Sequence, residues 1–376
     1  MSNVIIIGGG PAGCSAGVTI KRLMPELEVE LFEQRPKIGK VECGEAISKK
    51  AVEENSRILS NFLNKCIKRD VKEFKIIVNE GLEKTVKSPG YMIDRSNFNK
   101  SLMKEAGKLG CEIKTGHRAV PIGREAGKWK VRVENKYTSR IMVKSCEMLI
   151  LAGGASFRGI VDLGLIEEKD YEKWRKQHVF GYQYKISSLH QGEELVVDFR
   201  PNPTREVVYH YIFPHHDDIS NVGLLYNGKF VTKSFYDKLL REYLRKIGIR
   251  KFKFINRPAG NYIPGGGPLP RTYGDGILVV GDNAGFANPI FYGGVHPALS
   301  SGRIAGEVTV EAFRKNDLSE EFLKRYEDRW KEMPWGNPIL LKGKEIHEKI
   351  RNGEKVKPEE LEVYSKALDI TKDYGW

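Results

Sequence analysis

Three glycines near the start of the chain have the spacing of a turn that binds a dinucleotide. Gly8, Gly10 and Gly13 follow a run of β-branched residues, and Glu33 stands 20 residues after the third glycine. In such a turn the first glycine allows a sharp bend, the second lets the backbone approach a pyrophosphate, and the third allows close helix packing. An acid at this distance accepts hydrogen bonds from ribose hydroxyl groups. The pattern therefore predicts a dinucleotide cofactor without a 2′-phosphate.

A second turn that follows a hydrophobic run lies far along the chain, at Gly281 and Asp282. If the run at 276–280 is a strand, Asp282 lies at its carboxyl end, where an open α/β sheet binds its ligand. The carboxylate can then hydrogen-bond the ribose or ribityl part of an extended cofactor. The alternative is an ordinary turn at the start of a helix.

Cys43 lies in a long, glycine-punctuated segment, residues 34–50, whose length indicates either a functional or a mobile loop. Glu42 and Glu45 flank the cysteine, and nearby negative charge disfavours a thiolate. A neutral thiol at this position can donate a proton. The alternative interpretation is a small residue that packs beside a cofactor.

Three aromatic residues occupy alternate positions of one segment: Tyr209, Tyr211 and Phe213. Alternate residues of a strand share a face, so these side chains are expected to form one apolar wall. The two hydroxyl groups can position or protonate a molecule bound against that wall. The alternative is a sheet face packed against the core.

The hydrophobic periodicity predicts an α/β protein with two kinds of sheet. The apolar runs at 4–7 and 148–155 are typical of buried parallel strands, whereas the period of two over 178–230 is typical of antiparallel strands. We expect a Rossmann-like nucleotide-binding domain with an inserted antiparallel-sheet substrate domain and a C-terminal helical segment. The expected divisions are residues 1–75, 88–160 and 270–316 for the nucleotide-binding domain, 76–87 and 161–269 for the substrate domain, and 317–376 for the helical domain.

The same patterns give approximate bounds for individual elements. Helices are predicted at 15–24, at 47–65, from about 98 to 109, at 232–247 and in a stretch that ends near 314. Strands are predicted at 29–33, 71–78, 82–87, 111–115, 128–134, 139–144, 148–155, 178–186, 194–199, 207–214 and 220–226.

The composition limits the environment of the protein. None of the apolar runs in the 376 residues reaches the roughly 18–20 residues of a membrane span. The first strand begins by residue 4, which leaves no room for a signal peptide. The five cysteines are an odd number without the paired spacing of a metal site, so we expect no metal and a reducing cytoplasm.

The net charge of +13 is spread along the chain. It fits a solvated basic surface, or attraction to an anionic membrane, to phosphate-bearing substrates or to an acidic redox partner. No nucleic-acid partner is expected, because that function favours basic residues gathered together with interleaved aromatic ones.

These motifs, in their order along the chain, resemble those of the FAD-dependent superfamily of p-hydroxybenzoate hydroxylase. The resemblance covers residues 3–160 and 270–312, and it includes Asp94 and Arg95 before a predicted helix. Within the superfamily the chain is similar to the geranylgeranyl reductase family, especially archaeal reductases of digeranylgeranyl glycerophospholipids. The segments that carry this similarity are 41–46 with the cysteine, 209–214 with the alternating aromatic residues, and 289–295 with a glycine pair.

The aromatic segment departs from the family pattern at two positions. Tyr211 stands where the family usually has tryptophan, and Glu206 stands where a proline is expected. Because this segment is the family's substrate motif, the departure leaves the identity of the isoprenoid open.

The resemblance implies FAD as the cofactor. Arg95 is expected to neutralise a cofactor phosphate or to hold the loop that contains Cys43. The alternative is that Arg95 only forms a salt bridge on the surface. Val120 is expected near the adenine. The N–H groups of Gly293 and Gly294 are expected to stabilise negative charge at the N1/O2 side of reduced flavin. The expected cofactor-binding residues, with the glycine turn included, are Gly8, Gly10, Gly13, Glu33, Cys43, Gly44, Ala46, Arg95, Val120, Asp282, Pro289, Gly294 and Val295.

The resemblance also implies a reaction, the saturation of C=C bonds in geranylgeranyl chains of lipids or lipid precursors. An isolated prenyl double bond is neither polarised nor acidic, so it needs a hydride from flavin N5 at one carbon and a proton at the other. Cys43, Tyr209 and Tyr211 are the implied catalytic residues, and Tyr209, Tyr211 and Phe213 the implied substrate-binding ones.

Partners follow from the same interpretation. The chain shows no second glycine motif, so electrons are expected from a docking donor such as ferredoxin, a deazaflavin or transient NAD(P)H. Peripheral contact with the membrane fits the basic charge and a lipid substrate.

Two other functions remain open on the sequence. One is a flavin-dependent monooxygenase or halogenase of the same superfamily, although neither tryptophan of the halogenases' W-x-W-x-I-P pattern is present. The other is a non-catalytic flavoprotein that binds lipid or relays electrons.

Overall fold

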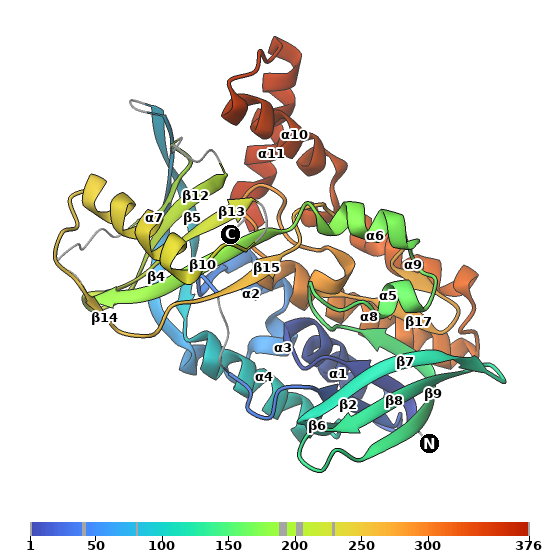
Figure 1. Cartoon of the computed structure of the whole chain (residues 1–376). Helices are drawn as coiled ribbons and strands as arrows, with labels where there is room; N and C mark the ends of the chain where they lie inside the picture. The colour runs from blue at the N-terminus through green and yellow to red at the C-terminus, as the bar shows by residue number, and fades with distance from the viewer. Residues whose placement is uncertain are drawn as a thin grey trace.

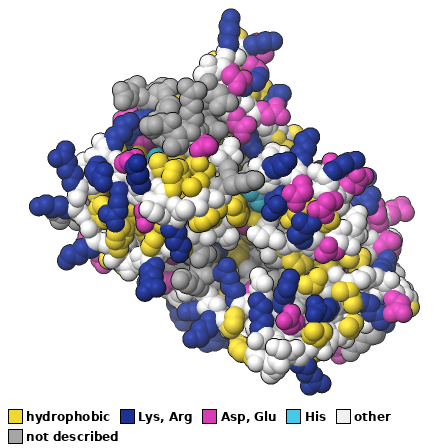
Figure 2. Space-filling view, viewed as in Figure 1, with side chains coloured by type: hydrophobic (Ala, Val, Ile, Leu, Met, Phe, Trp, Pro, Cys, Tyr) yellow, Lys and Arg dark blue, Asp and Glu magenta, His cyan; other side chains and the backbone are white. Residues whose placement is uncertain are grey.

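The computed structural model of the chain describes residues 2–39, 43–79, 82–187, 194–200, 206–227 and 230–374. Two sheets with helices packed on them make up most of the molecule, and C-terminal helices complete it (Figure 1). Lys and Arg side chains are spread over the face shown in Figure 2. The predicted α/β class is confirmed.

The first sheet is a mainly parallel sheet in the order β16-β17-β9-β1-β2-β6, with β8 beside β9 and β7 beside β8. Its central strand β1 pairs in parallel with β2 and β9. The side chains of residues 4–7 are apolar and buried, which suits a strand covered on both faces. The bounds are β1 Ser2–Ile7, β2 Val29–Glu33, β6 Glu112–Thr115, β7 His117–Glu125, β8 Lys128–Asn135, β9 Ile141–Leu151, β16 Tyr273–Gly274 and β17 Ile277–Val279.

Two helices that follow glycine-rich turns pack tightly against each other beside this sheet. They are α1 (Pro11–Leu23) and α8 (Val295–Lys315). A Cβ atom at Gly302 would lie only 2.1 Å from the backbone oxygen of Ala12, so only glycine allows this approach. The close packing places the N-terminus of α8 near that of α1.

The second sheet is mainly antiparallel, in the order β14-β10-β13-β12-β11-β4-β5-β3, and β15 pairs with β10. Helix α7 (Lys233–Lys246) packs on one face through Tyr236, Leu240 and Leu244, which are fully buried. The bounds are β3 Ala46–Ser48, β4 Ile67–Asn79, β5 Leu82–Ile93, β10 Val179–Ser187, β11 Leu195–Asp198, β12 Val207–His216, β13 Ile219–Asn227, β14 Lys253–Phe254 and β15 Ala259–Ile263.

The remaining helices connect the sheets or follow them. Asp94 caps α4, because its side chain accepts a hydrogen bond from the N–H of Asn97 (2.9 Å). The bounds are α2 Lys49–Glu54, α3 Ser56–Leu59, α4 Arg95–Lys108, α5 Gly159–Asp162, α6 Glu168–Arg175, α9 Glu320–Lys331, α10 Pro338–Asn352 and α11 Pro358–Tyr374, with 3₁₀ turns at Leu63–Lys65, Gly281–Ala284 and Pro334–Gly336.

Most predicted elements are present, and the four strands expected between 178 and 226 are confirmed. The helical stretch predicted over 47–65 is largely confirmed, but its first two residues belong to β3 and the rest is divided into α2, α3 and a 3₁₀ turn. Asn55 interrupts it, since its side-chain amide donates to Ala51 O (2.9 Å) and to Ser300 Oγ of α8 (3.0 Å). The strands predicted at 139–144 and 148–155 are one strand, β9, which pairs with β8 through its first half and with β1 through its second.

The second sheet also takes in β3, β4 and β5, a larger N-terminal part of the chain than residues 76–87. The first sheet and its helices contain the elements around both glycine-rich turns. The division of the chain into domains stays a prediction.

Candidate active site

A cavity of about 660 Å³ lies between the two sheets and brings the expected site residues together. Gly13 and Pro289 do not line it. The other expected residues all do: Gly8, Gly10, Glu33, Cys43, Gly44, Ala46, Arg95, Val120, Tyr209, Tyr211, Phe213, Asp282, Gly294 and Val295. The cavity therefore joins the glycine turn to the aromatic segment.

The glycine turn forms one end of this cavity, and its three glycines have different surroundings. Gly8 has a φ of +109°, and a Cβ atom there would lie 2.2 Å from Ala152 O. At Gly13 a Cβ atom would lie 2.0 Å from Gly8 O, so this glycine serves helix packing. At Gly10 a Cβ atom would meet no atom within 4 Å and would occupy the cavity itself. This open position beside the N-terminus of α1 fits the diphosphate of a dinucleotide.

Glu33 is held at the edge of the same turn. Its Oε2 accepts a hydrogen bond from the N–H of Gly9 (2.9 Å), and its Oε1 accepts one from the N–H of Arg35 (2.7 Å). Each carboxylate oxygen keeps a further acceptor site. The position fits the predicted role as a ribose acceptor.

Arg95 lines the cavity from the first turn of α4. Its Nη1 donates to Asn99 Oδ1, while its buried Nε has no hydrogen-bond partner among the residues that the structure describes. An unpaired buried guanidinium N–H is costly, and an anionic group in the cavity would satisfy it. This orphaned donor is a second observation that fits a phosphate-bearing cofactor.

Asp282 and the N-terminus of α8 line the cavity on the first-sheet side. Gly294 is the N-cap of this 21-residue helix, and no side chain in the described part of the chain caps it. The free N–H groups there favour negative charge. A Cβ atom at Gly294 would lie 3.0 Å from Asp282 Oδ1, so the glycine keeps the two groups close. Burial raises the pKa of Asp282 to about 6, although the charge of Arg95 opposes this shift.

We expect Asp282→Asn to stabilise the cofactor-free protein at pH 8 but not at pH 4. Because the pKa of Asp282 is raised on folding, the cost to stability builds up as the pH rises from the unfolded pKa to about 6 and is fully present above that pH. The side chain partly faces the cavity, so we expect a gain of about 1–2 kcal/mol. Urea denaturation of the two proteins across this pH range measures the difference. If the difference in free energy of unfolding between the two proteins did not change with pH, the raised pKa of Asp282 would be contradicted.

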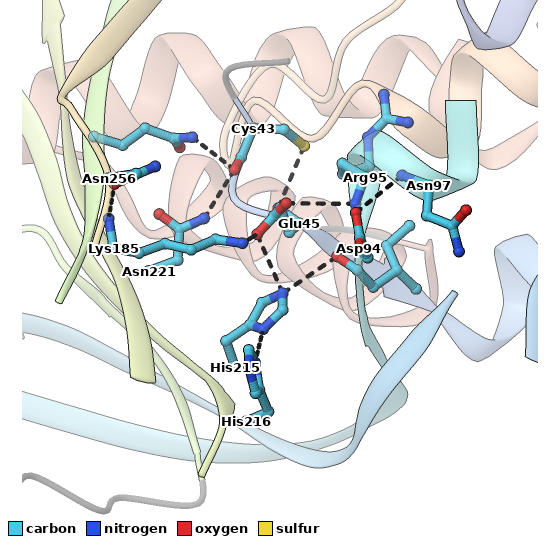
Figure 3. Close-up of polar contacts among 12 residues, drawn as sticks. Cys43, Glu45, Asp94, Arg95, Asn97, Lys185, His215, His216, Asn221 and Asn256 are labelled. Carbon is cyan, nitrogen blue, oxygen red and sulfur yellow. Dashed lines mark hydrogen bonds and ion pairs between the residues drawn. The ribbon is translucent and has the colours of Figure 1, made fainter. Parts of the chain in front are cut away.

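The backbone of Cys43 is held by the second sheet. Its carbonyl oxygen accepts a hydrogen bond from Gln183 Nε2 (2.8 Å). It accepts a second one from Asn221 Nδ2 (2.9 Å), as Figure 3 shows. The sulfur accepts a hydrogen bond from the N–H of Glu45 (3.3 Å). Val41 and Glu42, which carried part of the predicted motif, lie outside the described residues. These contacts fix the thiol at the cavity wall.

Glu45 anchors the same loop through ionic contacts. Its Oε2 lies 2.5 Å from Lys185 Nζ and 3.1 Å from His215 Nε2, and the carboxylate is nearly buried (Figure 3). Burial alone raises the pKa of Glu45, but the hydrogen bond from His215 and the charge of Lys185 outweigh it and lower the pKa. The negative charge of Glu45, one of the two acids that flank Cys43 in the sequence, is therefore largely compensated.

We expect Glu45→Gln to lower the free energy of unfolding by about 2 kcal/mol at pH 7, because it leaves Lys185 without its partner. Since the pKa of Glu45 is lowered on folding, its contribution is present above the unfolded pKa and is lost as the pH falls through the folded one. The difference from wild type should vanish in acid. Glu53→Gln is the control, because its exposed pair with Lys49 is worth less than about 0.5 kcal/mol. If chemical denaturation showed the same loss of stability in both variants, Glu45 would not anchor the cysteine loop.

The aromatic wall is present as predicted, because Tyr209, Tyr211 and Phe213 all line the cavity. Burial raises the pKa of both tyrosines well above the usual value, so both are neutral. The Tyr209 hydroxyl donates to Phe291 O (2.7 Å), and the Tyr211 hydroxyl donates to Gln183 Oε1. Both hydroxyl protons are thus engaged by protein acceptors.

Sequence reasoning missed the residues that hold this wall and the cysteine loop. Gln183, Lys185 and Asn221 belong to β10 and β13, in segments predicted only as strands. Gly223 was also missed, although a Cβ atom there would lie 2.5 Å from the ring of Tyr211. The available signal was the alternation of polar Gln183 and Lys185 with buried aromatic neighbours.

The family model described as lycopene cyclase protein matches residues 3–334. A curated relative from Methanopyrus kandleri, digeranylgeranylglycerophospholipid reductase 2, is 30% identical and covers 98% of this chain and 90% of its own. A digeranylgeranylglycerophospholipid reductase from Methanocaldococcus jannaschii is 29% identical, over 99% of this chain and 91% of its own.

Two solved structures show the same fold. A geranylgeranyl bacteriochlorophyll reductase-like protein from Thermoplasma acidophilum has a TM-score of 0.79 and 24% identity, over 98% of this chain and 91% of its own. The flavin-dependent halogenase CmlS has a TM-score of 0.74 and 17% identity, over 96% of this chain and 67% of its own. The fold is thus one that flavin-dependent enzymes share. The chain belongs to the family that the lycopene cyclase model describes and, by its full-length relatives, to the geranylgeranyl reductases.

Proposed function

We propose that this protein is an FAD-dependent reductase that saturates C=C bonds of geranylgeranyl chains in lipids or lipid precursors. The observation that carries the proposal is the single cavity that joins a dinucleotide turn to a wall of buried aromatic side chains. Such a wall suits an apolar chain, because it excludes water and offers no charge. The names of the full-length relatives support the same substrate class.

The residues that would hold FAD are those whose free groups face the cavity. Gly10 leaves room for the diphosphate, the unpaired Nε of Arg95 offers it a hydrogen bond, and Glu33 accepts from the ribose. Asp282 and the N-terminus of α8 would meet the ribityl and flavin portions. Reduced FAD, when bound, supplies the hydride for one carbon of the double bond.

Cys43 is the residue best placed to give the proton to the other carbon. Both tyrosine hydroxyls already donate to protein oxygens. In the described part of the chain the Cys43 sulfur only accepts a hydrogen bond, so its S–H is free to point into the cavity. Tyr209 and Tyr211 then position the isoprenoid chain, and solvent restores the thiol proton between turnovers.

Electrons and lipid must both reach the cavity from outside. We infer that a docking donor such as ferredoxin, a deazaflavin or transient NAD(P)H reduces the cofactor, because we find no second glycine motif. Across the described residues, no helix is long and apolar enough to cross a bilayer. We infer peripheral contact with the inner face of the membrane, where a long isoprenoid lipid resides.

The proposal is tested by anaerobic turnover with a chemical reductant and a digeranylgeranyl glycerophospholipid. We expect products heavier by about two mass units for each saturated bond, read by mass spectrometry. Lipid that changes only after oxygen is admitted would indicate a monooxygenase instead. Unchanged lipid with a fully reducible bound flavin would indicate an electron-relay or lipid-binding protein.

A further inference from the structure

Residues 245–257, which we name the basic segment, carry positive charge that the protein does not neutralise. No acidic residue occurs between Glu242 and Asp275. Over the described ranges, none of the basic residues of the segment forms an ion pair, and all of them are exposed. They are Arg245, Lys246, Arg250, Lys251, Lys253 and Arg257. Phe252 and Phe254 interleave with them, so the expectation that the chain has no basic stretch with interleaved aromatic residues is wrong for this segment.

The basic segment also exposes apolar side chains. Phe254 is 44% exposed and Ile255 is 49% exposed, and the guanidinium of Arg241 lies 4.7 Å from the ring centroid of Phe254. Figure 2 shows apolar and basic side chains intermixed at the left of the molecule, over α7 and β14. Scattered apolar residues on a surface need no explanation, but a neighbouring pair among unpaired cations forms a recognisable patch.

The basic segment is continuous with the wall of the cavity. Strand β14 lies within it, and β15, which follows directly, pairs with β10 and lines the cavity through Asn261, Tyr262 and Ile263. Asn256 Oδ1 accepts a hydrogen bond from the N–H of Lys185 (2.7 Å), the residue that pairs with Glu45 of the cysteine loop (Figure 3). One short stretch of chain therefore runs from the exposed patch to the site.

A second exposed apolar pair is linked to the same wall. Phe230 is 46% exposed and Val231 is 44% exposed. The N–H of Phe230 donates to the hydroxyl of Tyr262 (3.3 Å), and the Phe230 ring contacts Phe180 edge-on. Apolar side chains thus occur near both ends of β10.

We propose that the basic segment docks on the surface of an anionic phospholipid bilayer and that an isoprenoid chain enters the cavity past β15. Cations that attract anionic headgroups, together with Phe and Ile that enter the headgroup region, are the combination that binds peripheral proteins to membranes. Nucleic acid would engage the cations and stack on Phe254, but neither nucleic acid nor an acidic protein gives a reason for the aliphatic Ile255 to be exposed beside it. This inference rests on the proposed function, because a lipid substrate explains why the protein would bind a membrane.

The test is co-sedimentation of the FAD-loaded, oxidised protein with vesicles of phosphatidylcholine alone or with 30% phosphatidylglycerol, a mixture on the order of natural anionic membranes. We expect binding to the anionic vesicles. The triple variant R250Q/K251Q/K253Q should bind them about 100-fold more weakly, at about fivefold for each charge. F254S/I255S should bind about tenfold more weakly at unchanged charge.

The matched control is K104Q/K108Q/K136Q, which removes three exposed lysines from α4 and the β8–β9 turn. It changes the net charge equally and should bind as the wild type does. Equal losses in the two triple variants, or no binding of the wild type, would overturn the proposal. Preferential binding of a short DNA duplex or of a ferredoxin, lost only in R250Q/K251Q/K253Q, would also overturn it.

Vesicle binding is measured without turnover, so it is independent of the proposed reaction. Turnover on detergent-dispersed lipid tests the proposed reaction separately, because it needs no membrane. A protein that binds vesicles through the basic segment but reduces no lipid would refute the proposed function and keep the docking surface. A protein that reduces dispersed lipid equally in all variants yet never binds vesicles would refute the docking surface alone.

Discussion

Gly10→Val should abolish FAD binding and leave the protein folded. The Cβ atom of this residue would project into the cavity, where it meets no protein atom within 4 Å. Gly10 has an ordinary extended conformation (φ −74°) before α1, so valine costs the fold no more than about 1 kcal/mol. The valine methyl groups would occupy the space for the diphosphate. We expect an FAD dissociation constant at least about 100-fold higher, which is about 2.7 kcal/mol.

The measurement is a flavin titration beside urea denaturation of the cofactor-free protein. Gly13→Ala is the matched control, because its Cβ atom would lie 2.0 Å from Gly8 O and outside the cavity. That variant should lose about 3 kcal/mol or more of stability. Normal FAD binding by Gly10→Val would show that the cofactor lies elsewhere.

Cys43→Ala should slow bond saturation about 10²–10⁴-fold, the usual contribution of a general acid, while flavin still binds. Of Cys43, Tyr209 and Tyr211, only the cysteine has a proton that no protein oxygen engages among the described residues. Tyr211→Phe should have a smaller effect of about tenfold, because its hydroxyl proton is directed at Gln183 rather than at the cavity. The rate of Cys43→Ser should lie between the rates of the wild type and of Cys43→Ala, because a hydroxyl can donate a proton but is a weaker acid than a thiol.

These rates are measured by mixing reduced protein with lipid and following the flavin spectrum. The control is Cys146→Ala, which removes a fully buried thiol of β9 that does not line the cavity. If the rate of bond saturation fell more in Tyr211→Phe than in Cys43→Ala, the proton donor would be the tyrosine and not the cysteine.

Contiguous motifs made much of the site predictable. The glycine turn works through the local backbone, so its spacing predicts both the turn and the strand before it. Alternation in β12 likewise predicts that Tyr209, Tyr211 and Phe213 share a face. The structure brings these segments to one cavity, as the predicted α/β fold requires.

Contacts between distant segments could not be predicted from the sequence. Glu45 precedes β3, whereas Lys185 belongs to β10 and His215 to β12, so no local pattern in the sequence predicts that these three side chains meet. The division of the helical stretch at 47–65 has a similar cause, because Asn55 hydrogen-bonds to Ser300 of α8, which lies far along the chain. Tertiary partners overrode local propensity in that segment.

The central claim is that each saturated double bond consumes one reduced flavin. The most direct measurement is a single-turnover titration without oxygen, in which flavin reoxidation and saturated bonds are counted in the same samples. We expect a ratio of about one, with no reoxidation when the lipid already has saturated chains. Flavin that stays reduced with unsaturated lipid until oxygen is added would contradict the reductase.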